Sequence, residues 1–381
     1  MSNATESSSS APVSAAAKKR TPSETSETSE TAATPQASAA DMATRLSAMK
    51  AAQRKHPVPT YDERIAWLDA LDKVVVKYKD EIVAAVREDF GNRSRHETLV
   101  AEVFITRGAI KHAREHLREW MDVQPREVAW TFLPGRAEVV VQPLGVIGII
   151  APWNYPMQLA LSPLVAVLAA GNRALIKPSE LTPATSDLLV KMMGEAFAAD
   201  QVGVVIGGAD VGEAFSKLPF DHLVFTGSTK VGRLVMRAAS ENLVPVTLEL
   251  GGKSPAIVDA EYSIDQAAIE IMTGKCFNSG QTCIAPDYVL LPKGKTDAFV
   301  AACKTAVAKM YPDMGKSVDY TSVVSEGHYN RLRGLVDDAK EKGAKVIDLN
   351  PGKDDLDPKA RKMAPVLVVD PGEDLGVMQE E

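Results

Sequence analysis

The stretch Val146-Ile-Gly-Ile-Ile150 is a short and continuous apolar run. A run of this kind is typical of a strand that is buried on both faces, as in the parallel sheets of α/β proteins. Just upstream, residues 138–142 are rich in β-forming side chains and end at Pro143, which favours an edge strand or a hairpin. Downstream, the apolar spacing becomes helical over residues 157–170. We expect Pro163 to restart that helix at its first position, where a proline removes no hydrogen bond.

Beyond this stretch, strand-like and helix-like segments alternate as far as residue 240. Strand character is found at residues 175–176, 202–206 and 222–225. Helical spacing is found from Thr182 onward and at residues 210–218 and 231–240. Such alternation predicts right-handed βαβ units, because a parallel strand is reached through a crossover helix. The predicted fold class is α/β, with a Rossmann-like parallel sheet.

The first part of the chain has a different composition. Residues 1–40 consist mainly of Ser, Thr, Ala and Pro, and we expect a disordered tail because so little there could be buried. Order is expected to begin near Asp41. Thr60 and Glu63 have the spacing of a capping box, and apolar residues recur at helical intervals after them. A second helical region is expected over residues 98–122.

That second helical region contains His112-Ala-Arg-Glu-His116, which matches an H-x-x-E-H pattern found in some zinc peptidases. Both histidines would lie on one face of the helix. The neighbouring residues are densely charged, and no third ligand is evident from the sequence. We therefore expect a solvated helix face there and no metal site.

Composition narrows the class of protein. The chain has 381 residues, 45% apolar content and a net charge of −7, without the lysine and arginine blocks that favour nucleic acid or anionic membranes. Three cysteines cannot form a disulfide framework and suit a reducing compartment. No apolar run is long enough for a membrane span, and no signal peptide is evident. We expect a cytoplasmic protein that binds neither nucleic acid nor membrane.

The second half of the chain returns to strand character, at residues 246–250 and 254–258. Ser263 or Asp265 is expected to cap a helix that leads to a cysteine-containing loop. Cys303 lies on the apolar stripe of a later helix and is expected in the core. A further helix is expected over residues 329–342, and strands at 346–349 and 365–369.

The cysteine-containing loop reads Lys275-Cys-Phe-Asn-Ser-Gly-Gln-Thr-Cys-Ile-Ala-Pro286. Small and polar residues precede Cys283, so we expect a non-helical loop that presents its thiol to a cleft. A cysteine acts as a nucleophile through its thiolate. The alternative is that Cys283 is a small buried packing residue, as most cysteines outside disulfides are. Cys276 is expected to pack at the end of the preceding helix.

Two further side chains could take part in chemistry. Glu249 lies in Val246-Thr-Leu-Glu-Leu-Gly-Gly252, a carboxylate in an otherwise apolar strand, where we expect it to be buried. Burial would suit a general base, although a structural ion pair is the alternative. Asn154 follows a buried strand within Ala151-Pro-Trp-Asn-Tyr-Pro156 and offers a neutral amide that can stabilise an oxyanion. It could equally hold a proline-rich turn.

A nucleotide site is suggested by two turns that follow predicted parallel strands. Thr226-Gly-Ser-Thr-Lys-Val-Gly232 runs into a helix, and its glycines, its exposed N–H groups and Ser228 could hold a pyrophosphate. A plain strand-to-helix turn is the alternative. Lys177 and Glu180, in Leu175-Ile-Lys-Pro-Ser-Glu180, could reach ribose hydroxyls, or could form a solvated loop pair.

Together these motifs resemble the aldehyde dehydrogenase superfamily. Phe277-Asn-Ser-Gly-Gln-Thr-Cys283 and Leu248-Glu-Leu-Gly-Gly-Lys-Ser-Pro255 are similar to its nucleophile and general-base motifs. The segments around Asn154, Lys177 and Gly227 match its other motifs in the family's order, and the resemblance extends over residues 41–381. Asp89-Phe-Gly-Asn-Arg-Ser-Arg-His-Glu-Thr98 further resembles the branch that contains coniferyl aldehyde dehydrogenases, near the class 3 enzymes.

The resemblance implies an enzyme that oxidises an aldehyde to the acid with NAD. Cys283 would form a thiohemiacetal whose oxyanion is held by Asn154 and the Cys283 N–H. Hydride transfer would leave a thioester, which Glu249 would hydrolyse by activating water. The implied cofactor contacts are Trp153, Lys177, Glu180, Gly227, Ser228, Gly232 and Leu250. The carboxylate of Glu180 favours NAD, although NADP is possible. A coniferaldehyde-like substrate is implied by the branch.

The resemblance also predicts the domain organisation. We expect a tail over residues 1–40, an NAD-binding domain over 41–247 with an edge hairpin near 126–143, and an α/β catalytic domain over 248–381. In the family a Glu-Ile-Phe-Gly-Pro-like segment and about a hundred further residues follow, so we expect the catalytic domain to be truncated at Glu381. A homo-oligomer is expected for the complete protein. The alternative function is an inactive fragment that binds nucleotide or a partner.

Overall fold

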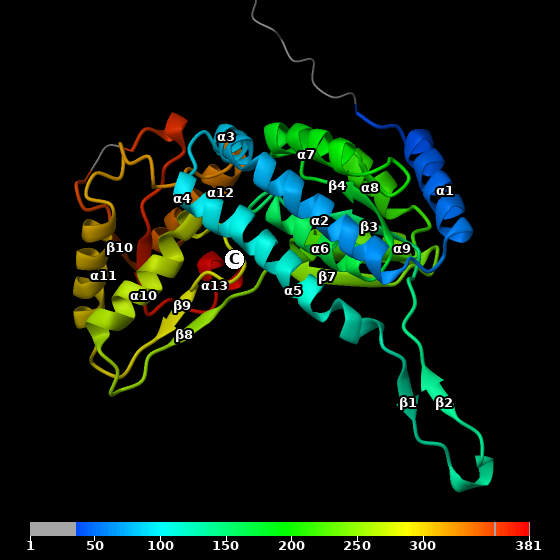
Figure 1. Ribbon diagram of the computed structural model, residues 1–381. Helices are drawn as coiled ribbons and strands as arrows, with labels where there is room; N and C mark the ends of the chain where they lie inside the picture. The colour runs from blue at the N-terminus through cyan, green and yellow to red at the C-terminus, as the bar shows by residue number, and fades with distance from the viewer. Residues whose placement is uncertain (1–35, 354–355, 381) are drawn as a thin grey trace, which may run out of the picture. The chain divides into compact units, whose positions relative to one another are not determined.

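The computed structural model of the chain describes residues 36–353 and 356–380 (Figure 1). The tail predicted for residues 1–40 therefore lies mostly outside the described residues. The first helix, α1 (Ala39–Lys55), begins slightly earlier than the sequence analysis expected. Its start is fixed by a capping box, in which the Ser38 hydroxyl accepts from Asp41 N at 3.1 Å and Asp41 accepts from Ser38 N at 3.2 Å.

A five-stranded parallel sheet forms the centre of the α/β part of the chain, which confirms the predicted fold class. Its strands, in order across the sheet, are β5 (Val202–Val204), β4 (Arg173–Lys177), β3 (Val146–Ile150), β6 (His222–Gly227) and β7 (Val246–Leu250). Each neighbouring pair is parallel. The carboxyl ends of all five strands therefore lie at one edge, where ligands bind in open α/β sheets.

The apolar run that forms β3 is buried because the strand has a neighbour on each side and a helical layer on each face. Ile147 and Ile149 pack into one apolar cluster, whereas Val146 and Ile150 pack into the other, as alternate residues of a strand must. Gly148 leaves room for close packing, since a Cβ there would lie 2.8 Å from the Phe220 ring.

Two layers of helices cover the two faces of the sheet (Figure 1). One layer contains α2 (Tyr61–Lys77), α3 (Lys79–Phe90), α5 (Ile105–Met121), α6 (Gln158–Ala169) and α7 (Pro183–Ala196). The other contains α1, α8 (Ala209–Ser216) and α9 (Thr229–Ser240). This three-layer arrangement accounts for the alternation of strands and helices in the sequence.

Local signals in the sequence are mostly confirmed in these helices. Thr60 and Glu63 form the predicted capping box at the start of α2, with Glu63 Oε2 accepting from Thr60 N at 2.7 Å. The helical region expected over 98–122 is composed of α4 (Arg95–Thr98), a π-helical segment (Leu99–Phe104) and α5. The prediction that Pro163 restarts a helix was wrong: α6 continues through it. Only the N–H of one residue is lost, and the apolar helix remains packed on both sides of it.

The remaining elements follow β7, and several of them share a third apolar cluster. They are β8 (Pro255–Ile257), α10 (Ile264–Cys276), β9 (Tyr288–Leu290), α11 (Thr296–Met310), α12 (Glu326–Glu341), β10 (Lys345–Asp348), β11 (Val366–Val369) and α13 (Gly376–Gln379). Ser263 caps α10, and Cys303 is fully buried, as the sequence predicted. The domain boundary between residues 247 and 248 stays a prediction; it falls inside β7.

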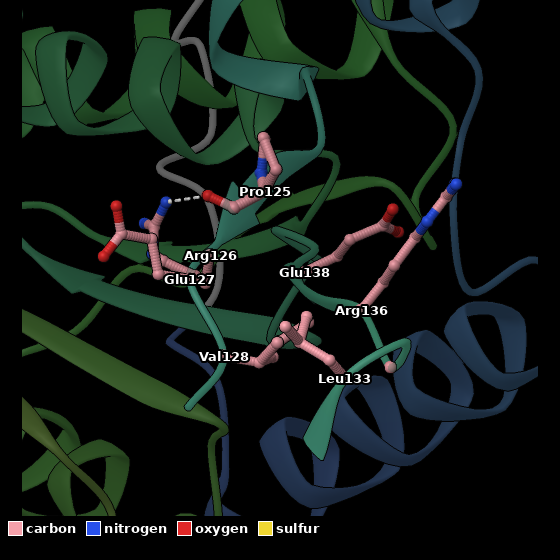
Figure 2. A pocket seen from close by; sticks show the side chains of 9 residues that line it. Pro125, Arg126, Glu127, Val128, Leu133, Arg136 and Glu138 are labelled. Carbon is pink, nitrogen blue, oxygen red and sulfur yellow. Dashed lines mark hydrogen bonds between the residues drawn. The ribbon is translucent and has the colours of Figure 1, made fainter. Parts of the chain in front are cut away.

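A hairpin of β1 (Gln124–Arg126) and β2 (Ala137–Val139) extends away from the five-stranded sheet (Figure 1). The strand expected over residues 138–142 is thus shorter and begins earlier than predicted. A hollow in this hairpin is lined only by its own residues, among them Arg126, Leu133 and Glu138 (Figure 2). Within residues 36–353 and 356–380, no helix is long and apolar enough to cross a membrane.

Candidate active site

Cys283 lies in a non-helical loop that follows the end of α10. The helix is followed by a 3₁₀ turn (Phe277–Gly280), in which Asn278, Ser279 and Gly280 have positive φ angles of 52°, 53° and 78°. Three left-handed residues in succession reverse the chain, and a Cβ at Gly280 would lie 3.1 Å from Lys275 O. The thiol of Cys283 then lies exposed within a tight turn. Its exposure excludes the alternative of a buried packing residue.

The other two cysteines have a different environment. Cys276 and Cys303 are 2% and 0% exposed and pack into the same apolar cluster. Burial raises the pKa of each of these thiols to about 12. Both therefore remain protonated at neutral pH and are poor nucleophiles. Cys283 is the exposed thiol among the three.

Asn154 is directly connected to the cysteine loop. It lies half-buried, four residues beyond the end of β3, and its Nδ2 donates to Gln281 O at 3.1 Å. Its main-chain oxygen accepts from Asn278 Nδ2 at 3.1 Å. Among the described residues, the second N–H of the Asn154 amide has no acceptor. An amide held against the loop that carries a thiol is a candidate donor to an oxyanion that forms there.

The residues next to Asn154 and Cys283 also hold the two loops together. The Tyr155 hydroxyl lies 2.5 Å from Thr282 Oγ1. Burial raises the pKa of Tyr155 to about 12, so its hydroxyl keeps its proton. The Gln281 side chain donates to Asn278 O at 2.9 Å and accepts from Val324 N at 3.0 Å. The position of Cys283 is therefore fixed by the residues immediately before it.

The predicted burial of Glu249 is wrong. The carboxylate was predicted to be buried, but the side chain of Glu249 is exposed. The physical reason is the position of β7, which is the last strand of the sheet and alternates between half-buried and exposed residues. Glu249 pairs in register with Thr226 of β6, so it lies at the carboxyl edge of the sheet. This edge also carries Asn154, beyond the end of β3.

Lys177 and Glu180 follow the end of β4 at that same edge. Lys177 is 3% exposed, and its Nζ donates to Glu180 Oε2 at 2.8 Å. Burial acts to raise the pKa of Glu180, but the hydrogen bond and positive charge of Lys177, together with a backbone hydrogen bond, hold the pKa below its usual value. The carboxylate is thus charged at neutral pH and still partly exposed. An exposed carboxylate is a suitable acceptor for ribose hydroxyls.

The turn between β6 and α9 has the features of a pyrophosphate site. Ser228 caps α9, accepting from Val231 N at 3.4 Å, and the helix N-terminus faces the carboxyl edge of the sheet. A Cβ at Gly227 would lie 2.6 Å from the Phe225 ring, and one at Gly232 would lie 2.8 Å from Leu250 Cδ2. A larger side chain at either position would therefore meet its neighbours closely.

Trp153, the remaining predicted cofactor residue, is half-buried next to Asn154. Its ring lies 4.8 Å from the ring of His328, in an edge-on arrangement, and 6.4 Å from that of Phe90. His328 comes from α12, far along the sequence, and the sequence analysis assigned it no role.

Several buried polar residues that contact the two loops were not predicted from the sequence. Arg93, Glu97, Glu102 and Asn278 are all buried and contact the Asn154 and Cys283 segments. The signal for them was available, because Glu97 and Glu102 lie in an otherwise partly apolar helical stretch. Charged residues at such positions are rarely buried without partners.

The predicted solvated helix face contains His112 and His116, whose rings lie 4.2 Å apart. His116 Nδ1 is 2.9 Å from His112 O, so one ring nitrogen is directed at the backbone. In the described part of the chain, no group of three or more His, Cys, Asp or Glu side chains is arranged to hold a metal ion.

Comparison with known proteins places the chain in a family. The sequence profile of the aldehyde dehydrogenase family matches residues 13–381. A probable coniferyl aldehyde dehydrogenase of Caulobacter vibrioides is 49% identical over 340 residues, which cover 88% of this chain and 70% of that protein. The coniferyl aldehyde dehydrogenase of Pseudomonas sp. (strain HR199) is 44% identical over 90% of this chain and 71% of its own length.

Solved structures of aldehyde dehydrogenases also match the fold of this chain. Staphylococcus aureus AldH in its substrate-bound state matches with a TM-score of 0.82 and 36% identity, covering 89% of this chain and 72% of that one. The aldehyde dehydrogenase of Mycobacterium tuberculosis in complex with NAD+ matches with a TM-score of 0.80 and 28% identity, covering 91% and 72%. The profile match over most of the sequence and the close relatives lead to one conclusion. The chain belongs to the aldehyde dehydrogenase family, whose members oxidise aldehydes with a nicotinamide cofactor.

Proposed function

We propose that this chain oxidises an aromatic, coniferaldehyde-like aldehyde to its carboxylic acid with NAD, using Cys283 as the nucleophile. The observation that carries this proposal is the hydrogen bond from the Asn154 amide to Gln281 O, two residues before the exposed thiol. It brings an oxyanion donor and a nucleophile from distant parts of the sequence to one place. Thiolate attack with a neutral amide donor is the chemistry of acyl and aldehyde centres.

The first step uses Cys283 and Asn154. The Cys283 thiolate attacks the aldehyde carbon, so that a C–S bond forms and the carbonyl π electrons move to oxygen. The second N–H of the Asn154 amide then donates to this oxyanion. A donor of this kind contributes roughly 10²- to 10³-fold to the rate in comparable enzymes.

The cofactor would be held at the carboxyl edge of the sheet. Glu180 would accept from the adenosine ribose, Lys177 would fix the position of Glu180, and the turn from Gly227 to Gly232 would bind the pyrophosphate at the start of α9. Trp153 and Leu250 would border the same site. When bound, NAD supplies the two-electron acceptor for the oxidation. The negative charge on Glu180 favours a free 2′-hydroxyl, and thus NAD over NADP.

Glu249 is proposed as the base that releases the product. Its exposed carboxylate has access to water, which a buried carboxylate would not have. It would take a proton from a water molecule that attacks the thioester carbon. The C–S bond then breaks, the acid leaves and the Cys283 thiolate is restored.

The aromatic substrate class is supported by the site and by two relatives. Trp153, Tyr155 and Phe277 border the Asn154 and Cys283 segments, and the rings of Tyr155 and Phe277 lie 6.5 Å apart and nearly parallel. Aromatic side chains interact favourably with flat aromatic ligands. The Pseudomonas protein named above is a coniferyl aldehyde dehydrogenase, and the Caulobacter protein is a probable coniferyl aldehyde dehydrogenase.

We further propose that the protein forms a homo-oligomer in the cytoplasm. The β1–β2 hairpin exposes Trp130, Phe132 and Leu133 at 83%, 71% and 65%. Exposed apolar side chains gathered on one element are typical of interaction surfaces. An exposed reactive thiol suits the reducing conditions of a cytoplasm.

The proposed function is tested by NADH formation from coniferaldehyde, with hexanal as the aliphatic comparison and NADP as the alternative cofactor. We expect the highest kcat/KM with coniferaldehyde and NAD. A chain that binds NAD in a calorimeter but forms no NADH with any aldehyde would favour the alternative of an inactive nucleotide-binding chain. Higher kcat/KM with hexanal would contradict the aromatic substrate class.

A further inference from the structure

Three charged side chains lie behind the loops that carry Asn154 and Cys283. Arg93 and Glu102 are fully buried and Glu97 is 8% exposed; we call these three residues the buried charge cluster. Burial raises the pKa of both carboxyl groups, although Arg93 opposes this. Buried ion pairs are poor stabilising devices, because apolar residues of similar volume often stabilise a protein as well or better. The cluster therefore calls for a role other than stability.

Arg93 and Glu102 hold the backbone at Asn154 and at the residues that follow it. Arg93 Nη1 donates to Asn154 O at 2.9 Å. Glu102 Oε2 accepts from Met157 N at 3.1 Å and from Gln158 N at 2.7 Å, at the start of α6. Arg93 Nη2 and Glu102 Oε1 face each other at 3.7 Å. The segment from Asn154 to the start of α6 is thus held at its two ends by one ion pair.

Glu97 holds the other loop. Its Oε2 accepts from Asn278 N at 3.1 Å and from Thr321 Oγ1 at 2.9 Å. Asn278 Nδ2 in turn donates to Asn154 O at 3.1 Å and to Gln281 O at 3.2 Å. Because Asn154 Nδ2 donates to that same Gln281 O, the hydrogen bonds form a closed ring between the two loops.

The guanidinium of Arg93 is also confined by aromatic rings. Its Cζ lies 4.9 Å from the centre of the Phe90 ring and 5.0 Å from that of Tyr155. A planar guanidinium stacks and donates in a fixed direction, which the ammonium group of lysine does not do. In the described residues, Arg93 Nε and Nη2 have no hydrogen-bond acceptor. The position of the Arg93 side chain is therefore fixed by packing between the two rings and by its hydrogen bond to Asn154 O, and not by a full set of hydrogen bonds.

We propose that the buried charge cluster positions the Asn154 amide against the Cys283 thiol, and that it acts on the reaction through that amide. Arg93, Glu97 and Glu102 are positioning residues in this scheme and touch no substrate. The inference rests on the proposed function, in which Asn154 donates to an oxyanion. It predicts that loosening the cluster slows reactions that form an oxyanion at the thiol and spares those that form none.

Two reactions of the Cys283 thiol separate these cases without cofactor or aldehyde. With p-nitrophenyl acetate, Sγ attacks the ester carbonyl and forms an oxyanion; the C–O bond then breaks, and p-nitrophenolate leaves behind an acetyl thioester. With iodoacetamide, Sγ displaces iodide at a saturated carbon, and no oxyanion forms. Both reactions are followed on the full chain, by nitrophenolate absorbance and by mass spectrometry of the Cys283 peptide.

Two variants test the proposal, Arg93→Lys and Asn278→Ala. The matched control is Arg64→Lys. Arg64 is also a buried arginine that donates to main-chain oxygens, to Pro59 O and to Ala169 O at the far end of α6. We expect Arg93→Lys and Asn278→Ala to slow acylation by roughly 100-fold, comparable to the loss of an oxyanion donor. Alkylation by iodoacetamide should keep its wild-type rate, and Arg64→Lys should change neither reaction.

These measurements separate a failure of the positioning role from a failure of the proposed aldehyde oxidation. Equal slowing of acylation and alkylation, or unchanged acylation in both variants, would overturn the positioning role. Absence of thiol acylation in the wild-type chain would overturn it as well, because Asn154 would then not act on an oxyanion. A wild-type chain that is acylated but forms no NADH from aldehydes contradicts only the proposed oxidation, and the comparison of variants still decides the role of the cluster.

Discussion

At the scale of single residues, the three cysteines differ in how far they are exposed to solvent. Cys283 is exposed in a tight turn, whereas Cys276 and Cys303 are buried, with pKa values raised to about 12. A thiol with so high a pKa is protonated at neutral pH, and burial also blocks access to it. Reactivity in this chain should therefore be confined to one of its three thiols.

Substitution of each cysteine tests this difference. Cys283→Ala should abolish aldehyde oxidation, whereas Cys276→Ala and Cys303→Ala should keep it and lose only stability, by about 1–2 kcal/mol for a small cavity. The measurements are steady-state NADH formation and urea unfolding of each variant. A loss of activity in Cys276→Ala as complete as in Cys283→Ala, with the fold intact, would show that the nucleophile is misassigned.

The raised pKa of Glu97 predicts how stability depends on pH. Burial raises the pKa of this carboxyl above its ordinary value of 4.5. Between that value and the raised one, the folded state holds more protons than the unfolded state, so the free energy of unfolding falls as pH rises. Glu97→Gln removes this contribution. The stability of the variant relative to wild type should thus increase from pH 4.5 upward, in urea unfolding at a series of pH values.

The exposed Glu213 on α8 provides the control for this prediction. The hydrogen bond from Lys217 lowers the pKa of Glu213, which is the opposite direction. Glu213→Gln should therefore show no relative gain as pH rises. A constant difference between Glu97→Gln and wild type over the whole series would mean that Glu97 titrates normally in the folded protein.

At the scale of elements, the sequence was most informative where local signals agree with the fold. The run at β3 and the capping box at Thr60 are properties of a few adjacent residues, and both were predicted. Pro163 was misjudged because apolar packing on both sides of a proline can maintain a helix through it. The exposure of Glu249 depends on which strand lies at the edge of the sheet, and strand order is not written in any one segment.

The turn from β6 to α9 provides an element-scale prediction. In Gly232→Ala the new Cβ would meet Leu250 Cδ2 at 2.8 Å, so Leu250 must shift at the proposed cofactor site. We expect the Kd for NAD to rise by roughly tenfold, or about 1.4 kcal/mol. Isothermal titration calorimetry measures this without any turnover.

The matched control is Gly194→Ala in α7, where nothing lies within 4 Å of the added Cβ. This change should leave NAD binding unaltered and stabilise the chain by about 0.5–1 kcal/mol, because alanine is the better helix former. Unchanged NAD affinity in Gly232→Ala would place the dinucleotide elsewhere than at this turn.

At the scale of the whole molecule, the candidate site is assembled from segments that are far apart in the sequence. Resemblance of short motifs predicted Asn154 and Cys283 as site residues, and the fold brings Asn154 to the cysteine loop through Gln281. Arg93, Glu97 and Glu102 were not predicted as part of the site. Their contribution depends on tertiary contacts across 61 residues from Arg93 to Asn154 and 181 from Glu97 to Asn278, which no local pattern encodes.

The exposed apolar hairpin gives the second whole-molecule prediction. Trp130→Ser combined with Phe132→Ser should shift the oligomer toward monomer, because both side chains are mostly exposed in the single chain. Sedimentation velocity at several concentrations measures this shift, and Val76→Ser, an exposed apolar residue on α2, is the control. An unchanged distribution of species in the double variant would exclude the hairpin as the interface.

The central claim is that Cys283 carries the acyl group and that Glu249 releases it. The most direct test is to mix Glu249→Gln with NAD and coniferaldehyde, to follow NADH by absorbance, and to map the bound acyl group by mass spectrometry. The account predicts a burst of about one NADH per chain, an acyl group on the Cys283 peptide, and turnover reduced by roughly 10²- to 10⁴-fold, as expected for loss of a general base. An acyl group on any other residue, or no burst although NAD is bound, would contradict it.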